Sequence, residues 1–195
     1  MNRFLKITGS LLIIGGLSLI GLIYTPIFKK EFHYQTHLAK PPSQEDKEVI
    51  PQSKEFGLVI PKIDINVRIF AEVDPNNPKE YLPLLTKGAA HAKGSALPGH
   101  RGNVFIFAHS ADTPLNITRY NAVFYLISKL EPNDEIIVYY QEEKYLYEVT
   151  EKKIIPSELV TESLRNLKGK TLTLQTCTPP GTTINRLLVI AKEKD

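Results

Sequence analysis

The chain has 195 residues, of which 42% are hydrophobic and 23% charged, and its formal net charge at pH 7 is +3. Such a composition is typical of one globular domain with an appendage, and it excludes a disordered chain. Because the charge is small and no dense Lys/Arg stripe is present, nucleic-acid binding has no support.

The first thirty residues predict a membrane anchor. Residues 7–28 carry no charged side chain and are mostly apolar, and about 20 apolar residues span a bilayer as a helix. A cleaved signal peptide has a shorter apolar region and a small-residue cleavage site, which this segment lacks. We therefore expect a cytoplasmic N-terminus at residues 1–6, a single transmembrane anchor at 7–28, and a domain outside the cytoplasm.

A polar stalk is predicted at residues 29–55. This segment contains Pro41-Pro42 and lacks a sustained apolar period, as linkers do. His33 and His37 are four residues apart and would share one face of a helix. With no third ligand nearby, we interpret their spacing as coincidence and expect no metal site.

Strand-like runs dominate residues 56–195, which we interpret as one folded domain. The run from Ile63 to Ile69 alternates apolar and polar side chains, as a strand with one buried face does. Similar runs follow at 103–108, 135–140, 145–150, 171–176 and 186–191.

Helical signals in this domain are few. The spacing of apolar residues predicts short helices over 121–130 and 157–167. The polar residues 141–144 predict a hairpin loop between two strands. Many short strands with isolated helices indicate an all-β domain that closes as a barrel and carries its function on the connecting loops.

Cys177 is the only cysteine and the first candidate for chemistry. It follows a strand-like run, so a strand fixes its backbone while the next loop leaves room for a substrate. A lone cysteine forms no internal disulfide and no multi-cysteine metal site. A free thiol has a pKa of about 8.5, so a nucleophilic cysteine needs a nearby base or cation.

Two further residues fit that need. His109 also ends an apolar strand-like run and would meet Cys177 if the two strands were neighbours. Arg186 begins the strand after the cysteine loop, and a guanidinium is suited to hold a developing oxyanion. The simpler interpretation is that His109 is a hydrogen-bonded histidine at a strand edge and that Arg186 is an exposed arginine at a strand end. His91, in a glycine-rich stretch, is the second choice for the base.

The motif Thr173-Leu174-Gln175-Thr176-Cys177, followed nine residues later by Arg and preceded upstream by Phe-Ala-His-Ser, resembles the sortases. These are cysteine transpeptidases of the Gram-positive cell surface. Residues 60–65 and 88–103 also resemble that family, and the similarity covers about residues 56–191. The resemblance implies an eight-stranded β-barrel with one or two short helices and a catalytic triad of His109, Cys177 and Arg186.

The resemblance also implies a reaction. Cys177 would attack a carbonyl in an LPxTG-like sorting motif of a surface protein and form a thioester. An amine, such as one from a peptidoglycan precursor or a pilin lysine, would then take the acyl group. His109 would serve as acid and base, and Arg186 would steady the oxyanion. No cofactor is implied, and scattered carboxylates do not establish a need for calcium.

In this family the segment before the cysteine strand forms part of the groove for the sorting motif. We expect Leu159, Val160 and Leu164, together with Thr176 beside the cysteine, to contact substrate. The alternative is that the same apolar spacing only covers the core. Because the sequence shows neither a second apolar span nor a convincing lid motif, a single-anchor housekeeping-type or class D or E-like enzyme is favoured.

Two other functions remain open at this stage. A cysteine protease would use the same nucleophile and base but resolve the acyl-enzyme with water. A surface-tethered binding barrel would keep Cys177 as an inert residue.

Overall fold

The computed structural model describes residues 7–21, 25, 32, 49–110, 122–165 and 167–194. Residues 7–21 form a helix. In the part of the chain that the structure describes, no helix combines the length and apolarity needed to cross a membrane. The predicted cytoplasmic segment 1–6, the His33 and His37 pair, a smaller part of the predicted anchor and most of the predicted stalk lie outside the described residues.

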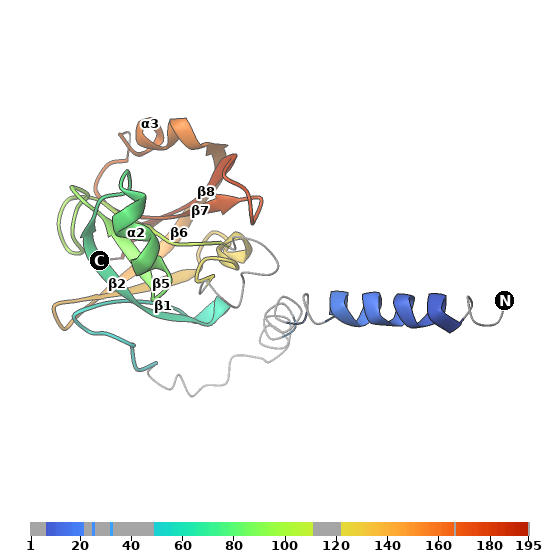
Figure 1. The fold of residues 1–195 in the computed structure, drawn as a ribbon. Coiled ribbons are helices and arrows are strands. Elements are labelled where there is room, and N and C mark those ends of the chain that lie inside the picture. The colour runs from blue at the N-terminus through green and yellow to red at the C-terminus, as the bar shows by residue number, and fades with distance from the viewer. Residues whose placement is uncertain are drawn as a thin grey trace.

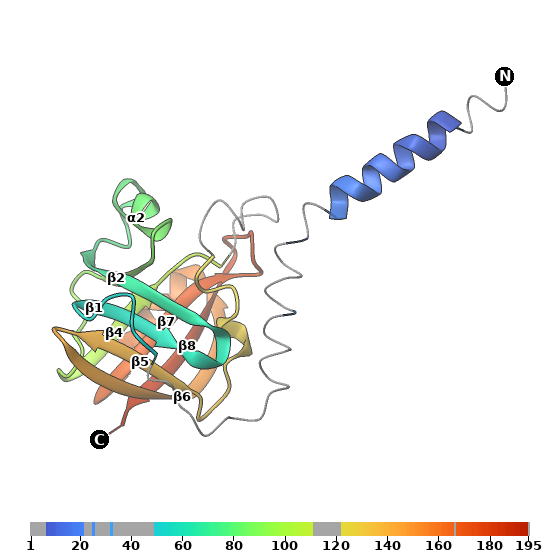
Figure 2. The same ribbon diagram turned by 90° about the horizontal axis from the view of Figure 1, so that it is seen from below.

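The described part of the domain is a closed barrel of eight strands in the order β1-β2-β3-β4-β7-β8-β6-β5 (Figures 1 and 2). Two neighbouring pairs, β2 with β3 and β4 with β7, run parallel. The strands are β1 (Phe56–Ile60), β2 (Ile65–Val73), β3 (Ala89–Ala92), β4 (Gly102–Phe107), β5 (Glu135–Tyr140), β6 (Glu143–Pro156), β7 (Lys170–Thr178) and β8 (Asn185–Glu193). The prediction of an all-β barrel is confirmed.

Alternation along the strands divides core from surface. Val104 and Ile106 of β4 and Leu172 and Leu174 of β7 are buried in the large cluster that fills the barrel. Their neighbours in sequence therefore point to the outer face. A second apolar cluster lies there, in which Phe105 of β4 is one of the buried residues.

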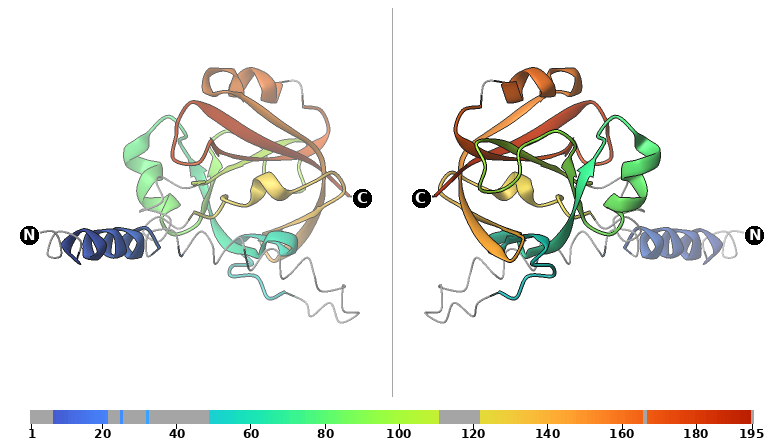
Figure 3. Two further views of the ribbon diagram at one scale, coloured as in Figure 1. Left: turned by 90° about the vertical axis from the view of Figure 1, so that its right-hand side faces the viewer. Right: turned by 90° about the vertical axis from the view of Figure 1, so that its left-hand side faces the viewer.

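Two helices cover this outer face. Helix α2 (Pro78–Leu85) contributes Leu85 to the second cluster, and Val160 and Leu164 of α3 (Val160–Arg165) pack against it. Figure 3 shows the two helices at separate places around the barrel wall. Three 3₁₀ turns complete the described elements: η1 (Pro61–Ile63), η2 (Ile127–Lys129) and η3 (Ser157–Leu159).

The structure differs in detail from two predictions, the strand at 63–69 and the hairpin loop at 141–144. Asp64 has a φ of 53° and closes η1, so β2 starts only at residue 65 and continues to 73. Strand β1 precedes it, and its five residues are all buried, which removes the alternation that identifies a strand. The hairpin turn narrows to Gln141 and Glu142, with positive φ angles of 50° and 70°, as tight hairpins require.

Both predicted helices are shorter than expected. In 122–130 the regular element is only η2, because Phe124, Ile127 and Leu130 are fully buried at intervals of three residues, the spacing of a 3₁₀ turn. The second predicted helix, over 157–167, is present over 157–165, as η3 followed by α3.

Candidate active site

Parallel pairing of β4 and β7 brings His109 level with Cys177. Phe107 stands opposite Gln175 in this ladder, and continuing the register by two residues pairs His109 with Cys177. The contact extends beyond the end of β4, because the Ala108 amide donates to the Gln175 carbonyl at 3.2 Å. The two strand ends that carry the candidate base and nucleophile are therefore neighbours.

Both residues belong to the outer face of the barrel. Leu174 and Ala108 belong to the internal core cluster, so Cys177, three residues after Leu174, and His109, one residue after Ala108, fall on the opposite face. The Cys177 side chain is half-buried. The backbone of His109 is held from a third side, since its carbonyl accepts the Phe124 amide at 3.0 Å.

Arg186 is the direct partner of Cys177 in the antiparallel ladder of β7 and β8. Side chains at such positions share one face, with Cβ atoms about 5 Å apart. The guanidinium Nη1 donates to the carbonyls of Thr183 at 3.0 Å and Asn185 at 3.2 Å. These two bonds hold the cation over the loop that follows Cys177, and the remaining N–H groups can still face a substrate.

His91, the second choice for the base, is held inside the domain by hydrogen bonds. It is fully buried and its Nε2 lies 3.0 Å from the Ala96 carbonyl and 2.8 Å from Ser95 Oγ. Its Nδ1 accepts the Glu72 amide at 3.4 Å. Burial lowers the pKa of His91, although the Ala96 carbonyl and the Glu72 charge oppose that shift. A neutral imidazole here links β2, β3 and the turn after β3.

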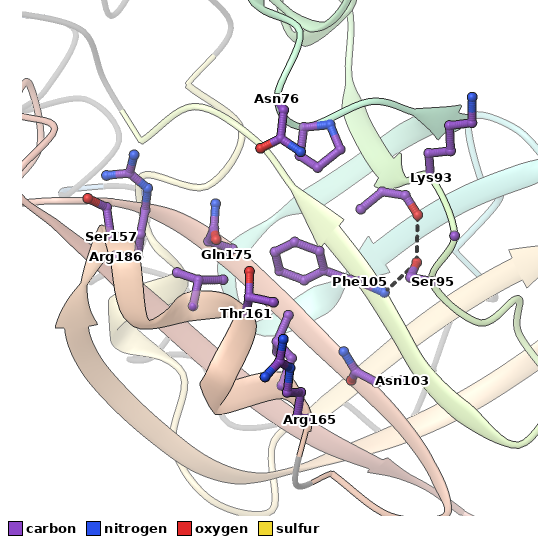
Figure 4. Close-up of a pocket in the computed structure, with 15 residues that line it drawn as sticks. Asn76, Lys93, Ser95, Asn103, Phe105, Ser157, Thr161, Arg165, Gln175 and Arg186 are labelled. Carbon is purple, nitrogen blue, oxygen red and sulfur yellow. Dashed lines mark hydrogen bonds between the residues drawn. The ribbon is translucent and has the colours of Figure 1, made fainter.

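A groove of about 560 Å³ runs along the outer face beside this constellation. Its floor is formed by Asn103 and Phe105 of β4 and Gln175 of β7, and Arg186 closes one end (Figure 4). One wall comes from η3 and α3, and the other from the segment after β2 and the turn after β3. The wall residues are Ser157, Val160, Thr161, Leu164 and Arg165 on one side and Pro75, Asn76, Ala92, Lys93, Gly94 and Ser95 on the other.

The four predicted substrate contacts separate into two pairs. Val160 and Leu164 line the groove, where they also pack on the second apolar cluster. Leu159 is 43% exposed and does not line it. Thr176 is buried and its hydroxyl donates to the Ala108 carbonyl at 2.9 Å, so it ties β7 to β4 instead of facing the groove.

Sequence reasoning missed the groove floor. Counting back in steps of two from Cys177 reaches Gln175, and from His109 it reaches Phe105 and Asn103. This period-two signal was available, because residues on one face of a strand share its surroundings. Among the described residues, no group of three or more His, Cys, Asp or Glu side chains is placed to hold a metal ion.

Comparisons with known proteins agree with this geometry. A sortase-domain family model matches residues 58–194. Sortase A from Corynebacterium diphtheriae is 29% identical, with a TM-score of 0.57 over 72% of this chain and 60% of that chain. Sortase E1 from Streptomyces coelicolor, solved with a tripeptide in its active site, is 27% identical, with a TM-score of 0.59 over 72% of this chain and 87% of that chain.

A third solved structure has a similar fold. Sortase C-1 from Actinomyces oris, 24% identical, has a TM-score of 0.61 over 87% of this chain and 99% of that chain. No match was found among curated proteins.

Proposed function

Because the chain belongs to the sortase family of cysteine transpeptidases, we propose that it cleaves an LPxTG-like sorting motif through Cys177 and transfers the acyl group to an amine. The observation that carries the proposal is the strand register. Cys177 lies opposite Arg186 on one side and level with His109 on the other. A nucleophile, an acid/base group and a cation thus come together beside the groove, whose lining includes Arg186 but neither Cys177 nor His109.

In the first half-reaction the Cys177 thiolate adds to the carbonyl carbon between Thr and Gly of the motif. The resulting oxyanion is stabilised by the Arg186 guanidinium. His109 gives a proton to the departing amine, the C–N bond breaks, and a thioester to Cys177 remains.

In the second half-reaction an amine attacks the thioester. His109 takes the proton that the amine loses, the C–S bond breaks, and the thiolate is restored. Bonds and protons balance without a metal or a redox group, so the proposed chemistry needs no cofactor. Water in place of the amine would give hydrolysis, which is the protease alternative.

The side chains that line the groove are suited to a peptide substrate. Val160, Leu164 and Phe105 offer an apolar surface that suits the leucine and proline of the motif. Polar side chains such as Gln175 and Thr161 lie among them and are placed to bind peptide groups. In the Streptomyces coelicolor enzyme a tripeptide occupies the active site.

We extend the proposal to location and partners. The helix over residues 7–21 exposes its apolar side chains, Leu12 by 78%, and a lipid environment would cover them. A single-pass anchor over the predicted span 7–28, with the barrel outside the cytoplasm, would place the site among envelope substrates. The acyl donors would be surface proteins with a C-terminal sorting signal. The acceptor would be a peptidoglycan-precursor amine or a pilin lysine.

Product analysis of the full chain in mild detergent tests the function. The chain is incubated with sorting-motif peptides and a triglycine amine, and the products are identified by mass spectrometry. We expect the ligated peptide, and no product from Cys177→Ala. Hydrolysed peptide alone would favour a protease. Absence of any cleavage, with no reaction of Cys177 towards thiol reagents, would favour a binding module.

A further inference from the structure

The charges that line the groove are all of one sign. Lys93, Arg165 and Arg186 are among its lining residues, and of the described residues that line it none is acidic. Glu158 and Glu162 belong to the same wall segment but do not line the groove. Arg186 lies at the Cys177 end and serves the reaction. The other two cations have no role in the chemistry proposed above.

Arg165 and Asn103 lie at the end of the groove away from Arg186 (Figure 4). Asn103 is oriented by two threonines of β7, because its Oδ1 accepts the Thr171 hydroxyl at 3.1 Å and the Thr173 hydroxyl at 2.9 Å. Its amide nitrogen makes no hydrogen bond to any residue in the described part of the chain. The oxygen is therefore engaged with the barrel, and the two N–H donors are left for the groove.

A donor-only surface of this kind recognises an anion. A guanidinium and an amide NH₂ both donate to oxygen, and a carboxylate accepts from both. A lysine side chain at the same place would be repelled by Arg165, and a neutral side chain would gain less from it. Lys93 on the opposite wall adds to the same field.

Strand geometry sets how far this end lies from the reacting bond. Asn103 is paired with Thr171, six residues before Cys177, which corresponds to about 20 Å along the strand. An extended peptide covers that length with about six residues. The acyl segment must stay bound through both half-reactions, whereas the leaving segment must depart. The part of the substrate that reaches Asn103 is thus on the N-terminal side of the scissile bond.

We propose that Asn103 and Arg165 select sorting-signal peptides carrying a carboxylate about six residues before the scissile bond, upstream of the four-residue acyl motif. The inference rests on the proposed function, since it uses the same groove. It adds a preference that the sorting motif itself does not contain.

The test compares three donor peptides with the full chain in detergent. They share Leu-Pro-Ala-Thr-Gly and differ only at the sixth and seventh residues before the scissile bond, which are Glu, Gln or Lys. We expect kcat/KM for the Glu peptide to exceed that for Gln by about three- to five-fold, as exposed charge pairs give. The Lys peptide should be slowest, and 0.5 M salt should reduce the differences.

Two variants and a matched control assign the preference. Asn103→Asp keeps an oxygen for both threonine hydroxyls but replaces the NH₂ with a negative oxygen, so it should remove the preference for Glu. Arg165→Gln should bring the Glu to Gln ratio close to one. Lys144→Gln removes the same charge from β6, away from the groove, and should leave the ratio unchanged. A Glu preference that persists in Asn103→Asp would overturn the assignment.

The carboxylate could also be supplied by the acceptor. Placing Glu or Gln on the amine instead of the donor should make no difference, and an effect confined to the amine would contradict the inference.

A binding measurement separates this inference from the proposed function. Fluorescence anisotropy with Cys177→Ala reports the Kd of each labelled donor peptide without turnover. If the native chain cleaves none of the peptides, the proposed function fails, yet tighter binding of the Glu peptide would still support the anion site. Equal Kd values for the Glu and Lys peptides would refute the anion site, whatever the turnover.

Discussion

Cys177 and Arg186 stand directly opposite each other in the ladder of β7 and β8. Their relation is fixed by backbone pairing within a closed barrel, so the loop between them is not needed to bring them together. The guanidinium itself is held by two main-chain carbonyls of that loop, those of Thr183 and Asn185. A cation that is positioned in this way before substrate arrives costs little reorganisation during the reaction.

Replacing Arg186 should therefore affect turnover more than folding. Arg186→Ala is expected to lower kcat by about 10²- to 10³-fold, the usual effect of losing an oxyanion donor. Arg186→Lys keeps the charge but loses the planar fork, so its kcat should fall between those of the native chain and Arg186→Ala. Steady-state kinetics with thermal unfolding as the control checks this. A normal kcat in Arg186→Ala would remove the residue from the reaction.

His91 and His109 should respond to substitution in opposite ways. His109→Ala is expected to reduce ligation by about 10³-fold or more through loss of the acid/base group, with little change in stability. His91→Ala should retain most of its turnover but lose about 1–3 kcal/mol of unfolding free energy, because it leaves Ser95 and Ala96 without their buried partner. Urea unfolding and ligation assays on both variants measure the two effects. The reverse pattern would exchange their roles.

His91 also predicts a pH dependence of stability. Its pKa is lowered in the folded state, mainly by burial, so the unfolded chain binds the proton more readily. Stability should be fully present above the unfolded pKa of about 6.5 and fall as the pH drops below it towards the folded pKa. The nearby Glu72 carboxylate, 3.4 Å from Nδ1, limits the loss because it favours the protonated ring.

Urea unfolding between pH 7.5 and pH 5 measures this loss. His91→Gln, which cannot titrate, provides the reference, and its stability should change less over the same interval. Parallel curves for the two proteins would show that other groups cause the pH dependence.

The candidate triad was accessible from sequence because each member marks a strand end. His109 and Cys177 both follow apolar runs, and Arg186 opens the next strand. Their proximity was not accessible, since β4 and β7 are separated by two intervening strands in the chain and pair in parallel only when the barrel closes. Period-two patterns report which face a residue occupies, but they do not report which strand lies beside it.

The groove was harder to predict for the same reason. Leu159 and Leu164 show the same apolar character, yet only Leu164 lines the groove. The two differ in their element, because Leu159 ends η3 and Leu164 lies one turn into α3. Lys93 and Asn103 enter the site from other strands and turns, so their role follows from three-dimensional packing alone. Fully buried β1 was similarly hidden, because it lacks alternation.

The division between Leu164 and Leu159 gives a final prediction about substrate binding. Leu164→Ala removes apolar surface from the groove wall and should lower kcat/KM for a sorting-motif peptide by about 10-fold, since a few lost methylene contacts alter discrimination by about 1–3 kcal/mol. Most of the change should appear in KM. Leu159→Ala removes the same atoms from a side chain that is 43% exposed and outside the groove, so its kcat/KM should stay within about two-fold.

Unfolding measurements on both leucine variants separate binding from packing, because Leu164 also contacts the second apolar cluster. If Leu164→Ala lost stability while its kcat/KM stayed normal, the residue would only cover the barrel wall. Equal losses of kcat/KM in the two variants would instead mean that the peptide crosses η3 as well as α3, and that the bound substrate extends beyond the groove.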